Sequence, residues 1–174
     1  MLRRTLEQPE EFAERYKTED FYRKVAQSAG RMKTANPDLT QTPAFLFIWI
    51  ESFLLTESPD ERGLEECRRS LAELEKQGFN STLEWNRCRA RLFYQQRNYL
   101  TAGRLWDQIA QSHKNPNKSQ QNWYWWRAKY YQFVCWKDGR LANPGEIRHA
   151  CDVLLAEMKE IPATWKQKIE RIAR

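Results

Sequence analysis

The chain has 174 residues, enough for one ordinary domain of about 100 to 200 residues, and 41% of them are hydrophobic. The 29 Lys and Arg residues outnumber the 23 Asp and Glu residues, which gives a formal net charge of +6 at pH 7. Aromatic residues make up 13% of the chain, whereas disordered segments contain few of them. Six glycines and seven prolines are too few for a β-sandwich or barrel, which needs a turn about every 8 to 12 residues. These numbers exclude a disordered chain and favour a mostly helical protein.

The start of the chain carries no targeting signal that we recognise. No apolar region follows Arg3 and Arg4, so we expect no secretory signal and a cytoplasmic protein. The most apolar stretch, 44–55, is shorter than the roughly 20 residues that span a bilayer. We therefore expect it to be a buried helix, and we expect no membrane partner.

The four cysteines are widely spaced, and no two of them have the two-residue gap of zinc knuckles or redox motifs. We expect them to be small hydrophobic residues of the core. A disulfide or a metal site is the alternative. The four positions are Cys67, Cys88, Cys135 and Cys151.

Capping signals divide the chain into helices. Thr42-Pro43 and 58–61 read as helix starts, as do the capping boxes at 81–84 and 143–146, and Gly78 reads as a stop. Between these signals apolar residues recur every three or four positions, which is the period of a helix. The pattern predicts helices near 9–33 (with Thr18 as a point of interruption), 43–56, 60–77, 82–96, 98–112, 120–137, 144–159 and 163–173.

From residue 43 onward the short connections predict three antiparallel hairpins, 43–56 with 60–77, 82–96 with 98–112, and 120–137 with 144–159. Small and large residues alternate in the second hairpin. Small side chains let two helices approach closely, and a bulky ring fills the hollow beside them. The residues of this pattern are Ala90, Phe93, Tyr99, Ala102 and Trp106. Three hairpins at a regular spacing predict a stacked helical repeat.

This pattern resembles the tetratricopeptide repeat, in which small residues mark the helix crossing. The unit 81–116 keeps the family's gap of twelve residues between Ala90 and Ala102. A third unit ending at Pro162 has a longer gap, from Ala128 to Ala150, and the unit 42–78 is degenerate.

The resemblance implies an all-α fold of antiparallel hairpins, stacked as a short right-handed solenoid over 42–174. The segment 163–174 would be its capping helix, and 1–41 a flank or cap at the other end. A helical bundle without repeats is the alternative.

Motifs of catalysis are missing from the sequence. His113 and His149 have no partners at metal-ligand spacing, and there is no Walker loop, G-x-G-x-x-G or G-x-S-x-G motif. We therefore expect no enzyme activity, no metal and no cofactor. A site of scattered carboxylates would not be found in this way.

Charge is distributed unevenly along the chain. Residues 42–80 contain eight acidic and four basic residues, whereas residues 81–174 contain 17 basic and eight acidic ones. The basic half is either a solvated face, a face that docks on the acidic half, or a surface that attracts a polyanionic partner.

The tetratricopeptide resemblance implies that the first helix of each hairpin lines a concave groove. Cations and aromatics there would suit an acidic or C-terminal peptide segment, because Arg offers a bidentate fork to carboxylates. In this interpretation Arg87, Arg91 and Lys129 bind the peptide, and Tyr94 and Trp125 anchor it. The expected groove residues are Glu84, Arg87, Arg91, Tyr94, Asn122, Trp125, Lys129 and Gln132.

The aromatic cluster 123–136 is interpreted chiefly as the core between repeats, because a helix between two neighbours is apolar nearly all round. The sequence thus predicts a scaffold or protein-interaction module. Aromatics near arginines also suit stacking on unpaired bases, so single-stranded nucleic acid is the second hypothesis. A structural subunit of a larger assembly, or a homo-oligomer, is the third.

Overall fold

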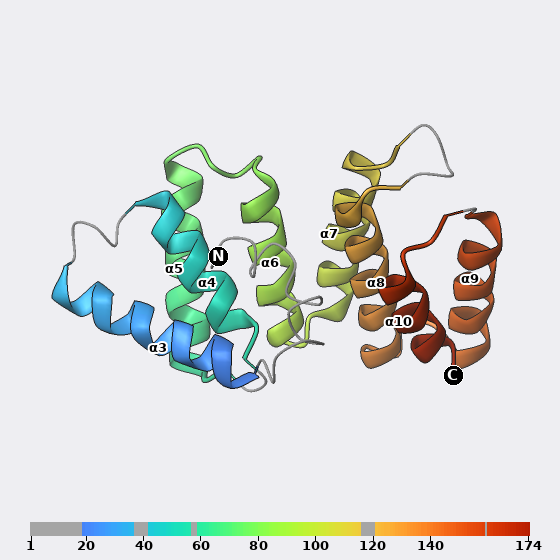
Figure 1. Ribbon diagram of the computed structural model, residues 1–174. Helices are drawn as coiled ribbons and strands as arrows, with labels where there is room; N and C mark the ends of the chain where they lie inside the picture. Colours follow the sequence, from blue (N-terminus) through green and yellow to red (C-terminus); the bar gives the residue numbers. More distant parts are fainter. Residues whose placement is uncertain (1–18, 37–41, 57–58, 116–120, 159) are drawn as a thin grey trace. The chain divides into compact units, whose positions relative to one another are not determined.

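The structure is a computed structural model that describes residues 19–36, 42–56, 59–115, 121–158 and 160–174. These residues form eight α-helices and no strand, so the predicted all-α fold is confirmed (Figure 1). The predicted helical segment 9–18 lies outside the described residues. The helices are α3 (Glu19–Ala35), α4 (Pro43–Leu54), α5 (Glu61–Lys76), α6 (Leu83–Gln95), α7 (Tyr99–Ser112), α8 (Trp123–Asp138), α9 (Pro144–Glu157) and α10 (Ala163–Ala173).

The helix ends follow the capping chemistry of the sequence. At the start of α9 the Asn143 side chain accepts from the backbone N–H of Glu146, and the Glu146 carboxylate accepts from the backbone N–H of Asn143, at 2.9 and 2.8 Å. Gly78 follows α5 with a φ of +86°, the left-handed conformation that a glycine adopts without strain. At the start of α6 the capping oxygen is that of Thr82, which accepts from the backbone N–H of Trp85.

The chain divides into two compact units, and the boundary falls between Gln95 and Gln96. This boundary lies between α6 and α7, the two helices that the sequence pairs in the second predicted hairpin. Unit 1 contains α3 to α6, and unit 2 contains α7 to α10. The stacking of hairpins into a right-handed solenoid stays a prediction.

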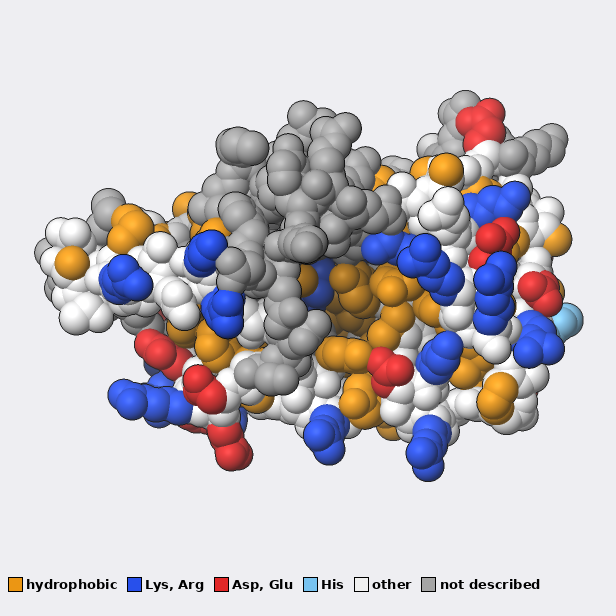
Figure 2. Space-filling view, turned by 60° about the horizontal axis from the view of Figure 1, so that its bottom comes forward, with side chains coloured by type: hydrophobic (Ala, Val, Ile, Leu, Met, Phe, Trp, Pro, Cys, Tyr) orange, Lys and Arg blue, Asp and Glu red, His pale blue; other side chains and the backbone are white. Residues whose placement is uncertain are grey.

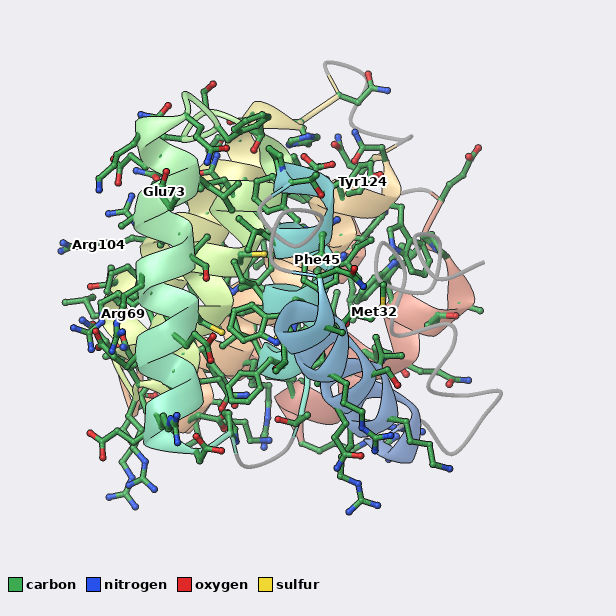
Figure 3. All side chains as sticks on the ribbon, turned by 90° about the vertical axis from the view of Figure 1, so that its left-hand side faces the viewer. Met32, Phe45, Arg69, Glu73, Arg104 and Tyr124 are labelled. Carbon is green, nitrogen blue, oxygen red and sulfur yellow. The ribbon has the colours of Figure 1, made fainter. Side chains whose placement is uncertain are left out.

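Helix α4 is the centre of unit 1, because it packs against α3, α5 and α6. Its side chains Leu46, Trp49, Ile50 and Leu54 are buried, as the apolar stretch predicted. They meet buried side chains of α5 and α6 in one cluster. Figure 3 views α3 and α5 from the front, with Arg69 on the side of α5 that is turned away from α3.

Helix α8 is the centre of unit 2, with α7 and α10 packed against it. Tyr131 stacks on Trp106 of α7 with ring centroids 4.9 Å apart, and Trp123 meets Trp165 of α10 edge-on at 4.8 Å. Trp165 and Ile169 are fully buried. The aromatic segment thus forms core contacts with two neighbouring helices, and the last helix closes this core.

All four cysteines are buried thiols, so their predicted place in the core is confirmed. Burial raises the pKa of Cys88 well above its usual value. Burial, with the nearby charge of Asp138, raises the pKa of Cys135 to about 12, and burial and Asp152 raise that of Cys151 to about 11. Thiolates are the reactive form of cysteine, so the raised pKa values lower the reactivity of Cys88, Cys135 and Cys151 in the folded protein.

No helix in the described ranges is long and apolar enough to cross a lipid bilayer.

Candidate functional site

Four of the expected groove residues lie on α6 of unit 1, and two of them are in its interior. Arg87 and Arg91 are 3% and 7% exposed. Nη2 of Arg87 donates to Oε2 of Glu51 at 2.5 Å, and Nε of Arg91 lies 3.7 Å from Oε1 of the same carboxylate. Glu84 and Tyr94 are half-buried. The two guanidinium groups thus neutralise a buried carboxylate of α4, and they do not present their charge on an open surface.

Electrostatics explain why Arg87 stays charged. Burial is the largest effect and would lower the pKa of Arg87, but the charge and hydrogen bond of the Glu51 carboxylate, together with Cys88, offset it, so the net pKa is raised. The sequence held one signal for this arrangement. Glu51 is the only charged residue in the apolar stretch 44–55, and a carboxylate on a buried helix needs a cation close to it.

Asn122, an expected groove residue of unit 2, is the N-cap of α8. Its side-chain oxygen accepts from the backbone N–H of Trp125 at 2.9 Å, and its Nδ2 donates to the backbone oxygen of His113 at 3.0 Å. The side chain is exposed but holds two structural hydrogen bonds. Asn122 thus ties the start of α8 to the end of α7.

The other three expected residues of unit 2 lie together at one pocket of about 350 Å³. Residues of α8 form one wall, residues of α9 and the residue after it form the other, and Gln111 and Lys114 at the end of α7 complete the lining. We call this space the α8–α9 pocket. Its principal wall residues are Trp125, Lys129, Gln132, Val153, Leu154 and Met158.

The pocket exists because α9 packs mainly on α10 and makes few contacts with α8. Helix α8 packs on α7 along one side, where Gly103 of α7 faces Cys135 of α8. A Cβ at Gly103 would meet the Cβ of Cys135 at 3.4 Å. The α9 side of α8 is therefore less completely covered than its α7 side.

Apolar groups dominate the walls of the α8–α9 pocket, and its polar groups are held in place. Nζ of Lys129 donates to Oδ1 of Asp107 and to Oε1 of Gln132, both at 2.9 Å. The ring of Trp125 is only 4% exposed and meets Trp126 edge-on at 4.9 Å. Val153 on the opposite wall is 39% exposed, which is high for a valine. The pocket can hold an apolar group beside a fixed ammonium.

Sequence reasoning missed the α9 wall, although it selected three residues of the α8 wall. Val153 and Met158 lie on the second helix of their predicted hairpin, which the tetratricopeptide resemblance does not place in a groove. An apolar Val153 between Asp152 and Leu154 gives no local sign of its exposure. That exposure depends on how far α9 stands from α8, and local patterning does not determine this distance.

The two histidines are separate from this pocket. Nδ1 of His113 lies 2.9 Å from the backbone oxygen of Ile109 within its own helix end, and the ring contacts Tyr124. His149 is on the exposed side of α9. Within the ranges that the structure describes, no group of three His, Cys, Asp or Glu side chains is arranged to hold a metal ion.

In comparisons with known proteins, no family model matches the chain, and neither a curated protein nor a solved structure matches it. The tetratricopeptide resemblance rests on the residue pattern alone and stays a prediction.

Proposed function

We propose that this chain is a protein-interaction module, and that the α8–α9 pocket holds a bulky apolar side chain from an acidic segment of a partner protein. The observation that carries the proposal is the pocket of about 350 Å³, which is lined by Trp125 on one wall and by the exposed Val153 on the other. Binding hot spots are commonly apolar anchors that fill such pockets. A volume of this size is at the small end of ligand sites, which run from about 300 to 1,000 Å³.

Charge favours an acidic segment around that anchor. Residues 96–174, which make up unit 2, contain 14 Lys and Arg against seven Asp and Glu. Lys114 and Lys129 both line the pocket, and Glu157 is the only acidic residue among the lining residues. A net positive unit speeds the encounter with acidic chains and disfavours basic ones.

The proposal retains two residues of the expected groove, Trp125 as the apolar wall and Lys129 as the polar one. It assigns no ligand to Arg87 or Arg91, because their guanidinium groups lie at the Glu51 carboxylate. Peptide recognition is thus proposed within unit 2 alone.

Single-stranded nucleic acid fits this surface less well. Stacking of successive bases needs several ring faces that are open to solvent, but Trp126 is fully buried, and Trp125, at 4% exposed, contributes only a small part of its surface to the pocket wall. The positive charge of unit 2 alone would attract nucleic acid without selectivity. The experiment must therefore distinguish nucleic-acid binding from peptide binding.

A peptide-display selection on the immobilised full chain tests the proposal. We expect enrichment of peptides that carry a Leu, Phe, Trp or Met flanked by Asp or Glu. The enriched peptides are then titrated against Val153→Glu, which places a carboxylate on the pocket wall. We expect binding to weaken by at least about tenfold, equivalent to about 1.4 kcal/mol.

Leu100→Glu provides the matched control. Leu100 is another exposed apolar residue of unit 2, at 51%, but it lies on α7 outside the pocket. Its change adds the same charge, so binding should remain within about twofold of wild type. Equal weakening by the two variants, or enrichment of peptides without an apolar anchor, would contradict the proposed site. Retention of an oligonucleotide in place of peptides would favour the nucleic-acid hypothesis.

A further inference from the structure

A second cavity, of about 700 Å³, lies at the other end of α9. It is bordered by the end of α8, the turn into α9, the first turn of α9 and the last residues of α10. We call it the basic pocket, because four of its lining side chains are Lys137, Arg140, Arg148 and Arg174. Figure 2, which brings this end forward, shows Lys and Arg side chains with hydrophobic ones between them on the right-hand part of the view.

Carboxylates do not balance these four cations. Glu146 is the only acidic residue among the lining residues, and its carboxylate already accepts from the backbone N–H of Asn143. Across the described residues, no ion pair joins a carboxylate to any of the four cations. The side chains that line the pocket thus carry an excess of three positive charges.

Two of the cations have a structural role that accounts for their positions. Nε of Arg148 donates to the backbone oxygen of Ala173 at 3.0 Å, and Nζ of Lys137 lies 3.5 Å from that of Ile172. Basic side chains commonly bind the last carbonyl groups of a helix, here those of α10. The side chains of Arg140 and Arg174 make no such hydrogen bond to the described residues.

Arg140 is held in a conformation that a glycine adopts more easily. Its φ is 51°, in the left-handed region, and it directly follows the end of α8. The backbone N–H of Leu141 donates to the backbone oxygen of Trp136 at 2.9 Å, and this hydrogen bond stabilises the turn. Gly139, the preceding residue, does not adopt the left-handed conformation, since its φ is −82°. The turn therefore directs a charged side chain toward the pocket at a cost in stability.

We propose that the basic pocket binds a small ligand that carries two or more phosphate groups. Each phosphate group carries about −1.5 to −2 charges near pH 7, so two of them match the excess of three better than one carboxylate does. Guanidinium groups bind phosphate oxygens through paired hydrogen bonds, and three of the four cations are arginines. Leu141, Ile147 and Ile172 provide an aliphatic part of the lining between the cations.

Calorimetric titration of the full chain with inorganic triphosphate tests this proposal. We expect saturable binding that weakens at least about tenfold in Arg140→Gln and in Arg148→Gln, because each change removes a charge-assisted hydrogen bond. Arg104→Gln is the matched control, since Arg104 is an exposed arginine of α7 outside the pocket (Figure 3). The control should bind as wild type does. Circular dichroism verifies that each variant is folded.

Two further probes define the ligand class. Citrate is a multiply charged anion that has carboxylates and no phosphate, and we expect it to bind at least about tenfold more weakly than triphosphate. A twelve-nucleotide single strand tests whether the pocket is part of a nucleic-acid surface. Absence of saturable triphosphate binding at millimolar concentration would overturn the proposal. So would equal losses in Arg104→Gln and Arg140→Gln, citrate binding as tight as that of triphosphate, or binding of the oligonucleotide alone. None of these outcomes depends on the α8–α9 pocket.

Discussion

Arg87 on α6 donates to the Glu51 carboxylate on α4 across 2.5 Å, and the two side chains are 3% and 4% exposed. These residues are 36 positions apart in the chain. Arg91 is one turn further along α6, and its Nε lies 3.7 Å from Oε1, the other oxygen of the same carboxylate. One buried carboxylate of α4 thus forms ion pairs with two guanidinium groups of α6 where these helices pack together.

Replacing this carboxylate should strongly destabilise unit 1. Glu51→Gln preserves the shape of the side chain but removes the negative charge that faces the buried guanidinium groups of Arg87 and Arg91. We expect the free energy of unfolding to fall by about 3 to 5 kcal/mol, as when one partner of a buried ion pair is removed. Urea unfolding followed by circular dichroism measures this change.

Glu65→Gln is the control for that experiment. Glu65 is paired with Arg68 and Arg69 on α5, but both arginine side chains are more than 60% exposed. Exposed pairs contribute about 0 to 1 kcal/mol, so the control should change little. A loss of similar size in the two variants would mean that burial does not strengthen the Glu51 cluster.

Two helical glycines should respond to alanine in opposite directions. A Cβ at Gly63 of α5 would overlap the ring of Phe53, so Gly63→Ala should cost about 1 to 3 kcal/mol through overpacking. A Cβ at Gly103 of α7 would meet Cys135 at 3.4 Å, an ordinary contact, so Gly103→Ala should gain about 0.5 to 1 kcal/mol from helix propensity. Thermal unfolding of the two variants measures both signs. The same sign in both would contradict the packing described for one of these helix pairs.

Arg140→Gly should separate stability from ligand binding. Removing the side chain relieves the left-handed strain at φ 51° and should stabilise the protein by about 1 kcal/mol. The same change should weaken triphosphate binding at least about tenfold, because a cation leaves the basic pocket.

Arg97→Gly is the comparison for this prediction. Arg97 also has a left-handed backbone, with φ of 59°, but it does not line the basic pocket. Its change should raise the unfolding temperature similarly and leave triphosphate binding unaltered. If Arg140→Gly keeps full affinity for triphosphate, the side chain has no role in the pocket.

The buried thiols predict a loss of stability at alkaline pH. Cys135, with its pKa raised to about 12, stays protonated in the folded protein, whereas an unfolded cysteine ionises above about pH 8.5. Between these values the unfolded chain binds fewer protons, so the free energy of unfolding falls as pH rises, by up to about 1.4 kcal/mol per pH unit for this group. Urea titrations from neutral to alkaline pH should show a shallower fall for Cys135→Ala than for wild type. Parallel pH profiles would contradict the prediction.

Much of the fold could be predicted from the sequence, because helix boundaries depend on local chemistry. The box at Asn143 and Glu146 and the stop at Gly78 each act within a few residues, and the structure confirms both. The helix predicted at 163–173 is present, and Trp165 and Ile169 are buried on it. Such features need no knowledge of distant parts of the chain.

The candidate site could be predicted only in part, because it depends on distant contacts. From the sequence alone, Arg87 is predicted to be an exposed groove residue. Only the structure shows that Glu51 lies beside it. Trp125 and Lys129 were selected through the resemblance, but Val153 was missed because its exposure depends on the spacing of α8 and α9. The basic pocket was missed for the same reason, since it joins side chains from α8, α9 and α10.

The boundary at Gln95 affects how unfolding of this protein should be observed. Six of its eight tryptophans belong to residues 96–174 and only Trp49 and Trp85 to the first unit, whereas backbone helices are present in both. Tryptophan fluorescence will therefore report mainly on the unfolding of the second unit. Far-ultraviolet circular dichroism will report on the helices of both units. If the units melt separately, the two signals will have different midpoints, and a destabilised Glu51 variant will lose ellipticity while much of its emission is still native.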